Sequence, residues 1–74
     1  MASYIKCVAV TVEGQREEKT TTTDKLPLLD LYCKMIDEMH RRQFDPEAPH
    51  VKRWECVISC DAEQVVKSYN FNMK

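Results

Sequence analysis

Six basic side chains flank a short proline-containing segment, and their chemistry is the most suggestive in this sequence. They are His40, Arg41, Arg42, His50, Lys52 and Arg53. Guanidinium and ammonium groups bind phosphates and carboxylates through charge-assisted hydrogen bonds. If the segment between them folds back, the two groups converge and predict a site for a nucleotide, another phosphate ligand or an acidic surface. A structural role competes with this interpretation, because cations in the last turn of a helix also complement the helix dipole.

Four cysteines and two histidines raise the question of a metal site, and their spacing argues against one. Cys56 and Cys60 lie four positions apart in an alternating segment, so on a strand they are about 13 Å apart. Tetrahedral zinc needs ligands that lie much closer together. Cys7 and Cys33 have no second ligand near them in the sequence. We therefore expect no metal and no cofactor, and we interpret the cysteines as reduced thiols, mostly in the core.

The recognisable motifs of enzymes are missing from the sequence. It contains one glycine, no glycine-rich phosphate loop, no G-x-S-x-G and no HExxH. Adjacent carboxylates occur at Glu17 with Glu18 and at Asp37 with Glu38. Neighbours on a strand point to opposite faces, and the helical pair has basic partners one turn away. These carboxylates are typical of a solvated surface, so we expect no catalytic residues and no enzyme.

The elements that carry these residues follow from the order of hydrophobic periods. Alternation predicts strands at both ends of the chain, and spacings of three and four between them predict one helix. The four predicted strands cover residues 3–13, 16–23, 52–61 and 65–73. The predicted helix starts after Thr23 or Asp24 as its N-cap, has Pro27 in its first turn and ends near Gln43, before Pro46. In the third strand, the side that carries Trp54 is predicted to face the core.

This pattern predicts an α+β fold, in which a ββαββ chain forms a four-stranded antiparallel sheet packed on one helix. If every pair of neighbours is antiparallel, the favoured spatial order is 2-1-3-4, which leaves the polar second strand at an edge. Residues 1–74 are predicted to form a single small domain. A composition of 43% hydrophobic and 31% charged residues is typical of a globular chain.

The first strand has apolar or small residues on both of its sides. One side carries Tyr4, Val8, Val10 and Val12, and the other carries Ile5, Cys7, Ala9 and Thr11. A strand of this kind is usually covered on both faces, whereas one helix covers only one face. We expect the side with Ile5, Cys7, Ala9 and Thr11 to form an interface with a second copy of the chain or with another partner.

A net charge of −1 and an isoelectric point near 6.1 argue against a nucleic-acid or anionic membrane partner on electrostatic grounds. With no apolar membrane span and no secretory signal, we expect a cytoplasmic location. The leading hypothesis is a small non-enzymatic binding protein, a homodimer that acts as an inhibitor or adaptor of a protein partner. Small domains of this kind resemble accessory proteins of phages and mobile elements. The alternative is an oligomeric protein that sequesters an anionic nucleotide or another phosphate ligand with the six basic residues.

Overall fold

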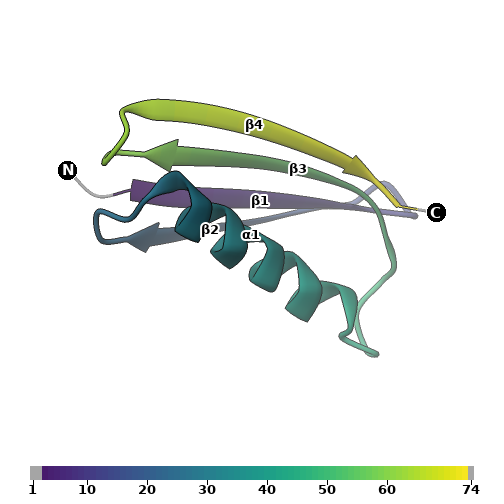
Figure 1. Ribbon diagram of the computed structural model, residues 1–74. Helices are drawn as coiled ribbons and strands as arrows, with labels where there is room; N and C mark the ends of the chain where they lie inside the picture. The colour runs from purple at the N-terminus through teal and green to yellow at the C-terminus, as the bar shows by residue number, and fades with distance from the viewer. Residues whose placement is uncertain (1–2, 74) are drawn as a thin grey trace.

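The computed structural model describes residues 3–73 and has the predicted α+β architecture (Figure 1). Along the chain, the elements are β1 (Ser3–Thr11), β2 (Arg16–Thr23), α1 (Leu28–Gln43), β3 (Val51–Cys60) and β4 (Val65–Asn72). The strands form one antiparallel sheet in the order β2-β1-β3-β4. The predicted strand order is therefore confirmed, and β2 and β4 are the two edges of the sheet.

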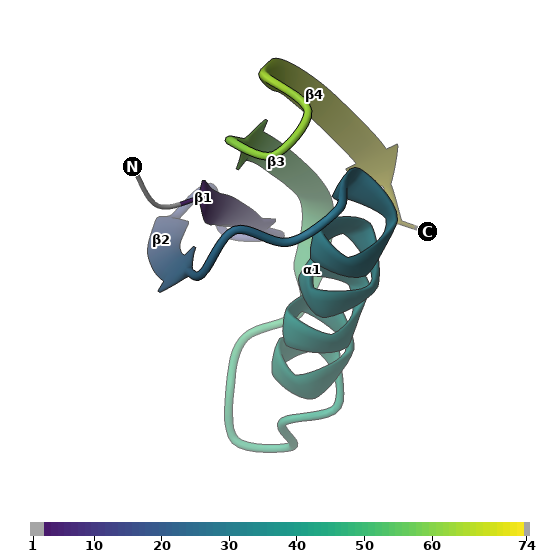
Figure 2. The same cartoon turned by 60° about the vertical axis from the view of Figure 1, so that its left-hand side comes forward.

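The helix α1 lies against one face of the sheet, as the rotated view shows (Figure 2), and its backbone runs over the central strands β1 and β3. Its buried residues are Leu31, Met35 and Met39, whose spacing of four places them on one side of the helix. The strands contribute Ile5, Cys7, Ala9, Val51, Trp54, Cys56, Ile58 and Cys60 to the same core. The side of β3 that carries Trp54 is thus the core side, as predicted.

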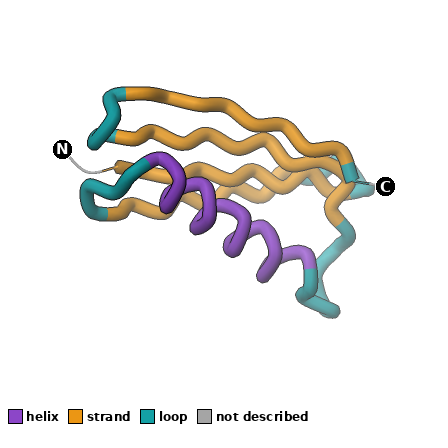
Figure 3. The backbone as a smooth tube through the Cα atoms, viewed as in Figure 1, coloured by secondary structure: helices purple, strands orange, loops and turns teal. Residues whose placement is uncertain are grey.

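The start of α1 is stabilised by a residue far away in the sequence. Pro27 occupies the N-cap position without a side-chain hydrogen bond, so the prediction of Thr23 or Asp24 as N-cap is wrong. The Leu28 N–H donates instead to the carboxylate of Glu63, at 2.7 Å, from the turn between β3 and β4. Figure 3 shows why this is possible, because the β2–α1 and β3–β4 connections lie at the same end of the sheet. A carboxylate at this place also complements the positive end of the helix dipole.

The pairing of β1 with β3 shifts by one residue between Val10 and Thr11. As a result Val51 and Trp54, three positions apart, are both buried in the core. Strict alternation would have put them on opposite faces, so the irregularity places two exposed residues, Lys52 and Arg53, between two buried ones.

Candidate functional site

The structure distributes the six predicted basic residues over several places. Arg42 points to β2, where its Nε and Nη2 each donate to the carboxylate of Glu17 at 2.9 Å. Its Nη2 also donates to the carbonyl oxygen of Pro49 at 2.9 Å. Arg41 pairs with Asp37, one turn back on α1, at 3.0 Å.

The remaining four basic residues lie elsewhere. Arg53 pairs at 2.9 Å with Glu55, on the sheet face away from α1. The ring of His40 lies 4.5 Å from the ring of Phe44. His50 and Lys52 line a cleft of about 380 Å³ at the end of the sheet. Each of the three arginines therefore already has a carboxylate partner, which an incoming phosphate would have to displace.

Two carboxylates show the electrostatic effect of these arginines. The hydrogen bonds from Arg42 hold the pKa of Glu17 below its ordinary value. Those from Arg16 hold the pKa of Glu55 below its ordinary value, with a smaller contribution from Arg53. Both carboxylates are therefore ionised at neutral pH, and the arginines are engaged in the fold.

The prediction that Ile5, Cys7, Ala9 and Thr11 form an exposed interface is wrong. Ile5, Cys7 and Ala9 belong to the core beneath α1, and Thr11 is fully buried. The hydroxyl oxygen of Thr11 accepts a hydrogen bond from the Gln15 N–H in the β1–β2 turn. Because both sides of β1 are apolar, its sequence cannot show which side the helix covers.

The face of the sheet away from α1 carries the other side of β1, and its central valines are shielded within the chain itself. Val8 lies between Glu18 and Glu55, and Val10 between Arg16 and Arg53, in the strand register. Arg16 on β2 binds the carboxylate of Glu55 on β3 at 2.8 Å, so the pair bridges across β1. Val8 and Val10 are 7% and 4% exposed as a result. Aliphatic stems of long charged side chains cover apolar surface in this way, so the centre of this face is buried within the chain itself.

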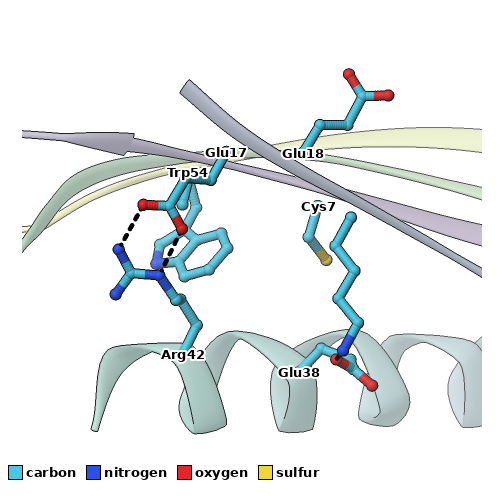
Figure 4. A pocket seen from close by; sticks show the side chains of 8 residues that line it. Cys7, Glu17, Glu18, Glu38, Arg42 and Trp54 are labelled. Atoms are coloured by element: carbon cyan, nitrogen blue, oxygen red, sulfur yellow. Dashed lines mark hydrogen bonds and ion pairs between the residues drawn. The ribbon is translucent and has the colours of Figure 1, made fainter. Parts of the chain in front are cut away.

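On the β2 side of α1 lies a groove of about 150 Å³, which we call the β2 groove (Figure 4). Its lining residues are Cys7, Ala9, Glu17, Glu18, Lys19, Glu38, Arg42 and Trp54. Two ion pairs connect β2 to the helix across it, Arg42 with Glu17 and Lys19 with Glu38 at 2.6 Å. The sequence suggests a local pair between Glu38 and the residue one turn on, Arg42. In the fold both side chains instead reach to β2.

On the opposite side of α1 lies a groove of about 260 Å³ between the helix and β4, which we call the β4 groove. It is lined by Ile36, Met39, His40, Gln43, Phe71 and Met73. We call Leu29 and Ile36 on α1 and Phe44 at its C-cap, which are 71%, 38% and 71% exposed, the exposed stripe. Ile36 lines the β4 groove, and the Phe44 ring lies 4.5 Å from the ring of His40, which also lines it. The helical period places Leu29 and Ile36 outside the buried line of α1. The stripe and the β4 groove together form an apolar surface next to an edge strand.

The edge strand β4 differs from β2 in its residues. Its sequence VVKSYNFN contains one charged residue, Lys67, whereas REEKTTTT in β2 contains four. β4 pairs with β3 on one side and, among residues 3–73, with no strand on the other. Unpaired N–H and C=O groups of an edge strand form hydrogen bonds with any further strand that reaches them.

The fold also brings together two cysteines that the sequence separates by 49 positions. Cys7 and Cys56 are directly opposite each other on β1 and β3, beneath the helix. The interpretation of cysteines as core thiols holds for Cys7, Cys56 and Cys60, which are buried and free, while Cys33 is exposed and free. The predicted antiparallel pairing of the first and third strands already brings these two segments together. The sequence does not fix the register of that pairing, which is what sets Cys7 opposite Cys56.

Comparisons with protein-family models, with curated proteins and with solved structures found no match for this chain. In the part of the chain that the structure describes, no three His, Cys, Asp or Glu side chains come together as a metal site. Within residues 3–73, α1 is neither long nor apolar enough to cross a membrane.

Proposed function

We propose that this protein is a small non-enzymatic binding protein that recognises a protein partner by strand addition at β4. The observation that carries the proposal is an edge strand with a single charge beside exposed apolar side chains, Ile36 and Phe44. In strand addition, main-chain hydrogen bonds supply affinity and alternate side chains enter adjacent pockets. The partner is therefore an extended segment with apolar side chains at every second position, some of which enter the β4 groove.

A second copy of the chain can supply such a segment, which supports the expectation of a homodimer. On β4, Val65, Tyr69 and Phe71 lie on the side of the helix and are partly buried against the core. Two β4 strands that pair about a two-fold axis would bring these side chains and both grooves together. An inhibitor or adaptor needs no more than this surface, and four free thiols suit a reducing compartment such as the cytoplasm.

Substitutions on the stripe test this proposal. Ile36→Asp and Phe44→Ser change exposed side chains, so we expect both variants to fold. Each should weaken the complex at least about tenfold, the effect of losing a residue that contributes 1.4 kcal/mol or more. Val66→Ser is the matched control, because Val66 is 66% exposed but lies on the sheet face away from the helix. Light scattering measures self-association, and quantitative capture from the source organism measures binding to another protein.

Hydrogen exchange distinguishes strand addition from other modes of binding. We expect the amides of β4 to gain protection in the complex, while those of β2 stay unchanged. If Val66→Ser weakens the complex as much as Ile36→Asp, or if β4 gains no protection, the proposed surface is wrong.

A further inference from the structure

Three sulfur atoms from three different elements converge beneath α1. Cys7 on β1 and Cys56 on β3 are cross-strand neighbours on the helix side of the sheet, where opposite Cβ atoms lie about 5 Å apart. The Sγ of Cys56 lies 3.8 Å from the Sδ of Met39 on α1. Two thiols and a thioether thus share one small region of the core.

The two thiols also influence each other's ionisation. A hydrogen bond from Cys56 lowers the pKa of Cys7, while burial and the carboxylate of Glu38 oppose this effect and the ammonium of Lys19 supports it weakly. The same hydrogen bond, together with burial, raises the pKa of Cys56. These opposite shifts reflect the close approach of the two thiols on neighbouring strands.

The sulfur cluster has a route to solvent through the β2 groove. Cys7 lines this groove and is 5% exposed. Figure 4 shows the Cys7 sulfur pointing down towards the helix, above Glu38 and beside the Trp54 ring. Cys7 lines the β2 groove and Cys56 and Met39 do not, so an ion that enters this groove meets the Cys7 sulfur first.

We propose that Cys7, Cys56 and Met39 form a binding site for a soft monovalent metal ion of the Cu(I) class. Thiolate and thioether ligands select Cu(I) over harder ions. Metal–thiolate bonds are about 2.3 Å long, so three ligands around one ion lie about 4 Å apart, close to the 3.8 Å between Cys56 and Met39. The nearest nitrogen and oxygen ligands do not complete a four-ligand site for zinc among the described residues.

Binding requires no change of oxidation state. The Cys7 and Cys56 thiols each lose a proton to solvent and form a metal–sulfur bond, and the Met39 sulfur donates a lone pair without losing a proton. The product carries one net negative charge, next to the Lys19–Glu38 ion pair of the β2 groove. Met39 also lines the β4 groove, whereas Cys7 and Cys56 do not, so Cys7→Ser and Cys56→Ser test the metal site without changing the β4 surface.

The test uses the full chain with its thiols reduced. Ag(I) serves as a redox-inert probe. Cu(I) is supplied under anaerobic conditions, and its affinity is measured by competition with a chelator of known affinity. Native mass spectrometry should find one ion per chain, and X-ray absorption should find three sulfur ligands. Cys7→Ser and Cys56→Ser should each lower the affinity by about 100-fold or more, because even outer-shell changes at metal sites produce 10-fold to 100-fold effects.

Two further sets of variants test the proposal if Cys7→Ser or Cys56→Ser disturbs folding. Met39→Leu preserves volume and should fold, yet it should lower the affinity by about 10-fold and reduce the sulfur ligands from three to two. Cys33→Ser and Cys60→Ser are the matched controls and should leave binding unchanged. Loss of binding in Cys33→Ser, an unchanged sulfur count in Met39→Leu, or the absence of a tight one-to-one complex would each overturn the proposal.

Discussion

The two flanks of α1 meet the sheet in different ways. Towards β2 the helix is connected by ion pairs, Arg42 with Glu17 and Lys19 with Glu38. Towards β4 it is connected by aromatic contact, with the rings of Tyr32 and Tyr69 5.3 Å apart in an edge-on arrangement. The helix backbone lies over the central strands, so on both flanks long side chains span the remaining distance.

The difference shows which edge of the sheet is protected against pairing with other chains. β2 carries charges and threonines, and its side chains on the helix side are used in ion pairs. Charged edges resist pairing with a further strand. β4 carries one charge and continues into an apolar groove, so it offers both hydrogen-bonding groups and surface to bury. This difference is the reason for placing the proposed recognition at the β4 flank, while the ion pairs of the β2 flank connect the helix to the sheet.

The largest effect on stability is expected from Tyr69→Ala on the β4 flank. Tyr69 contacts Tyr32 and stacks on Phe71 with ring centroids 6.4 Å apart. Full truncation of a buried aromatic residue removes 3–5 kcal/mol, and Tyr69 is only partly buried, so we expect a loss of about 2 kcal/mol in the free energy of unfolding. Urea denaturation measures this, with Thr21→Ala on the exposed edge strand β2 as the control. An equal loss in Thr21→Ala would remove the distinction between the flanks.

A smaller effect is expected from Glu17→Gln on the β2 flank. The Arg42–Glu17 pair is partly solvent-exposed, with 18% and 44% of the two side chains accessible. Pairs of this kind contribute at most about 1 kcal/mol, and we expect a loss of about 0.5 kcal/mol at neutral pH. The loss should shrink at high salt, which screens exposed charges, whereas the loss in Tyr69→Ala should not.

The pH dependence of the Glu17→Gln effect follows from the lowered pKa of Glu17. A carboxylate whose pKa is lower in the folded chain than in the unfolded chain stabilises the fold at every pH above its unfolded pKa, which is near 4.5. This contribution is lost as the pH falls from there through the pKa of the folded chain. The stability difference between wild type and Glu17→Gln should therefore be present at pH 7 and diminish in acid below pH 4.5. A difference that stays constant, measured by urea titrations across this range, would show that the ion pair does not act as described.

The smallest effect is expected from nucleotides. Arg41, Arg42 and Arg53 have carboxylate partners, so we expect no thermal shift with nucleoside mono-, di- or triphosphates. A ligand at 100 times its dissociation constant would add about 2.7 kcal/mol, which a thermal-shift assay detects readily. A clear shift that disappears in Arg53→Ala or Lys52→Ala would instead favour the nucleotide-binding alternative.

The fold could be predicted from the sequence because its signals are local. Alternation in the strands, the helical spacing of Leu31, Met35 and Met39, and the polar character of β2 each depend on residues within a few positions of one another. Antiparallel pairing of successive elements then leaves few arrangements. The strand order followed from these facts and is confirmed.

The contacts of the candidate site residues were harder to predict, because their partners are distant in the sequence. Arg42 and Glu38 have suitable partners one turn away, yet Arg42 pairs with Glu17 and Glu38 with Lys19. The apolar side of β1 that was predicted to be free is the side beneath the helix, and the other side is shielded by Arg16 and Glu55.

Element types and strand order were thus set by periodicities that act over a few neighbouring positions. The side of β1 that the helix covers, the partners of the arginines and the meeting of Cys7 with Cys56 depend on register and on the placement of α1. Both sides of β1 present apolar groups, so the strand by itself does not determine which side is covered. That choice comes from burying one continuous core that combines Trp54, Cys56 and Ile58 with the helix.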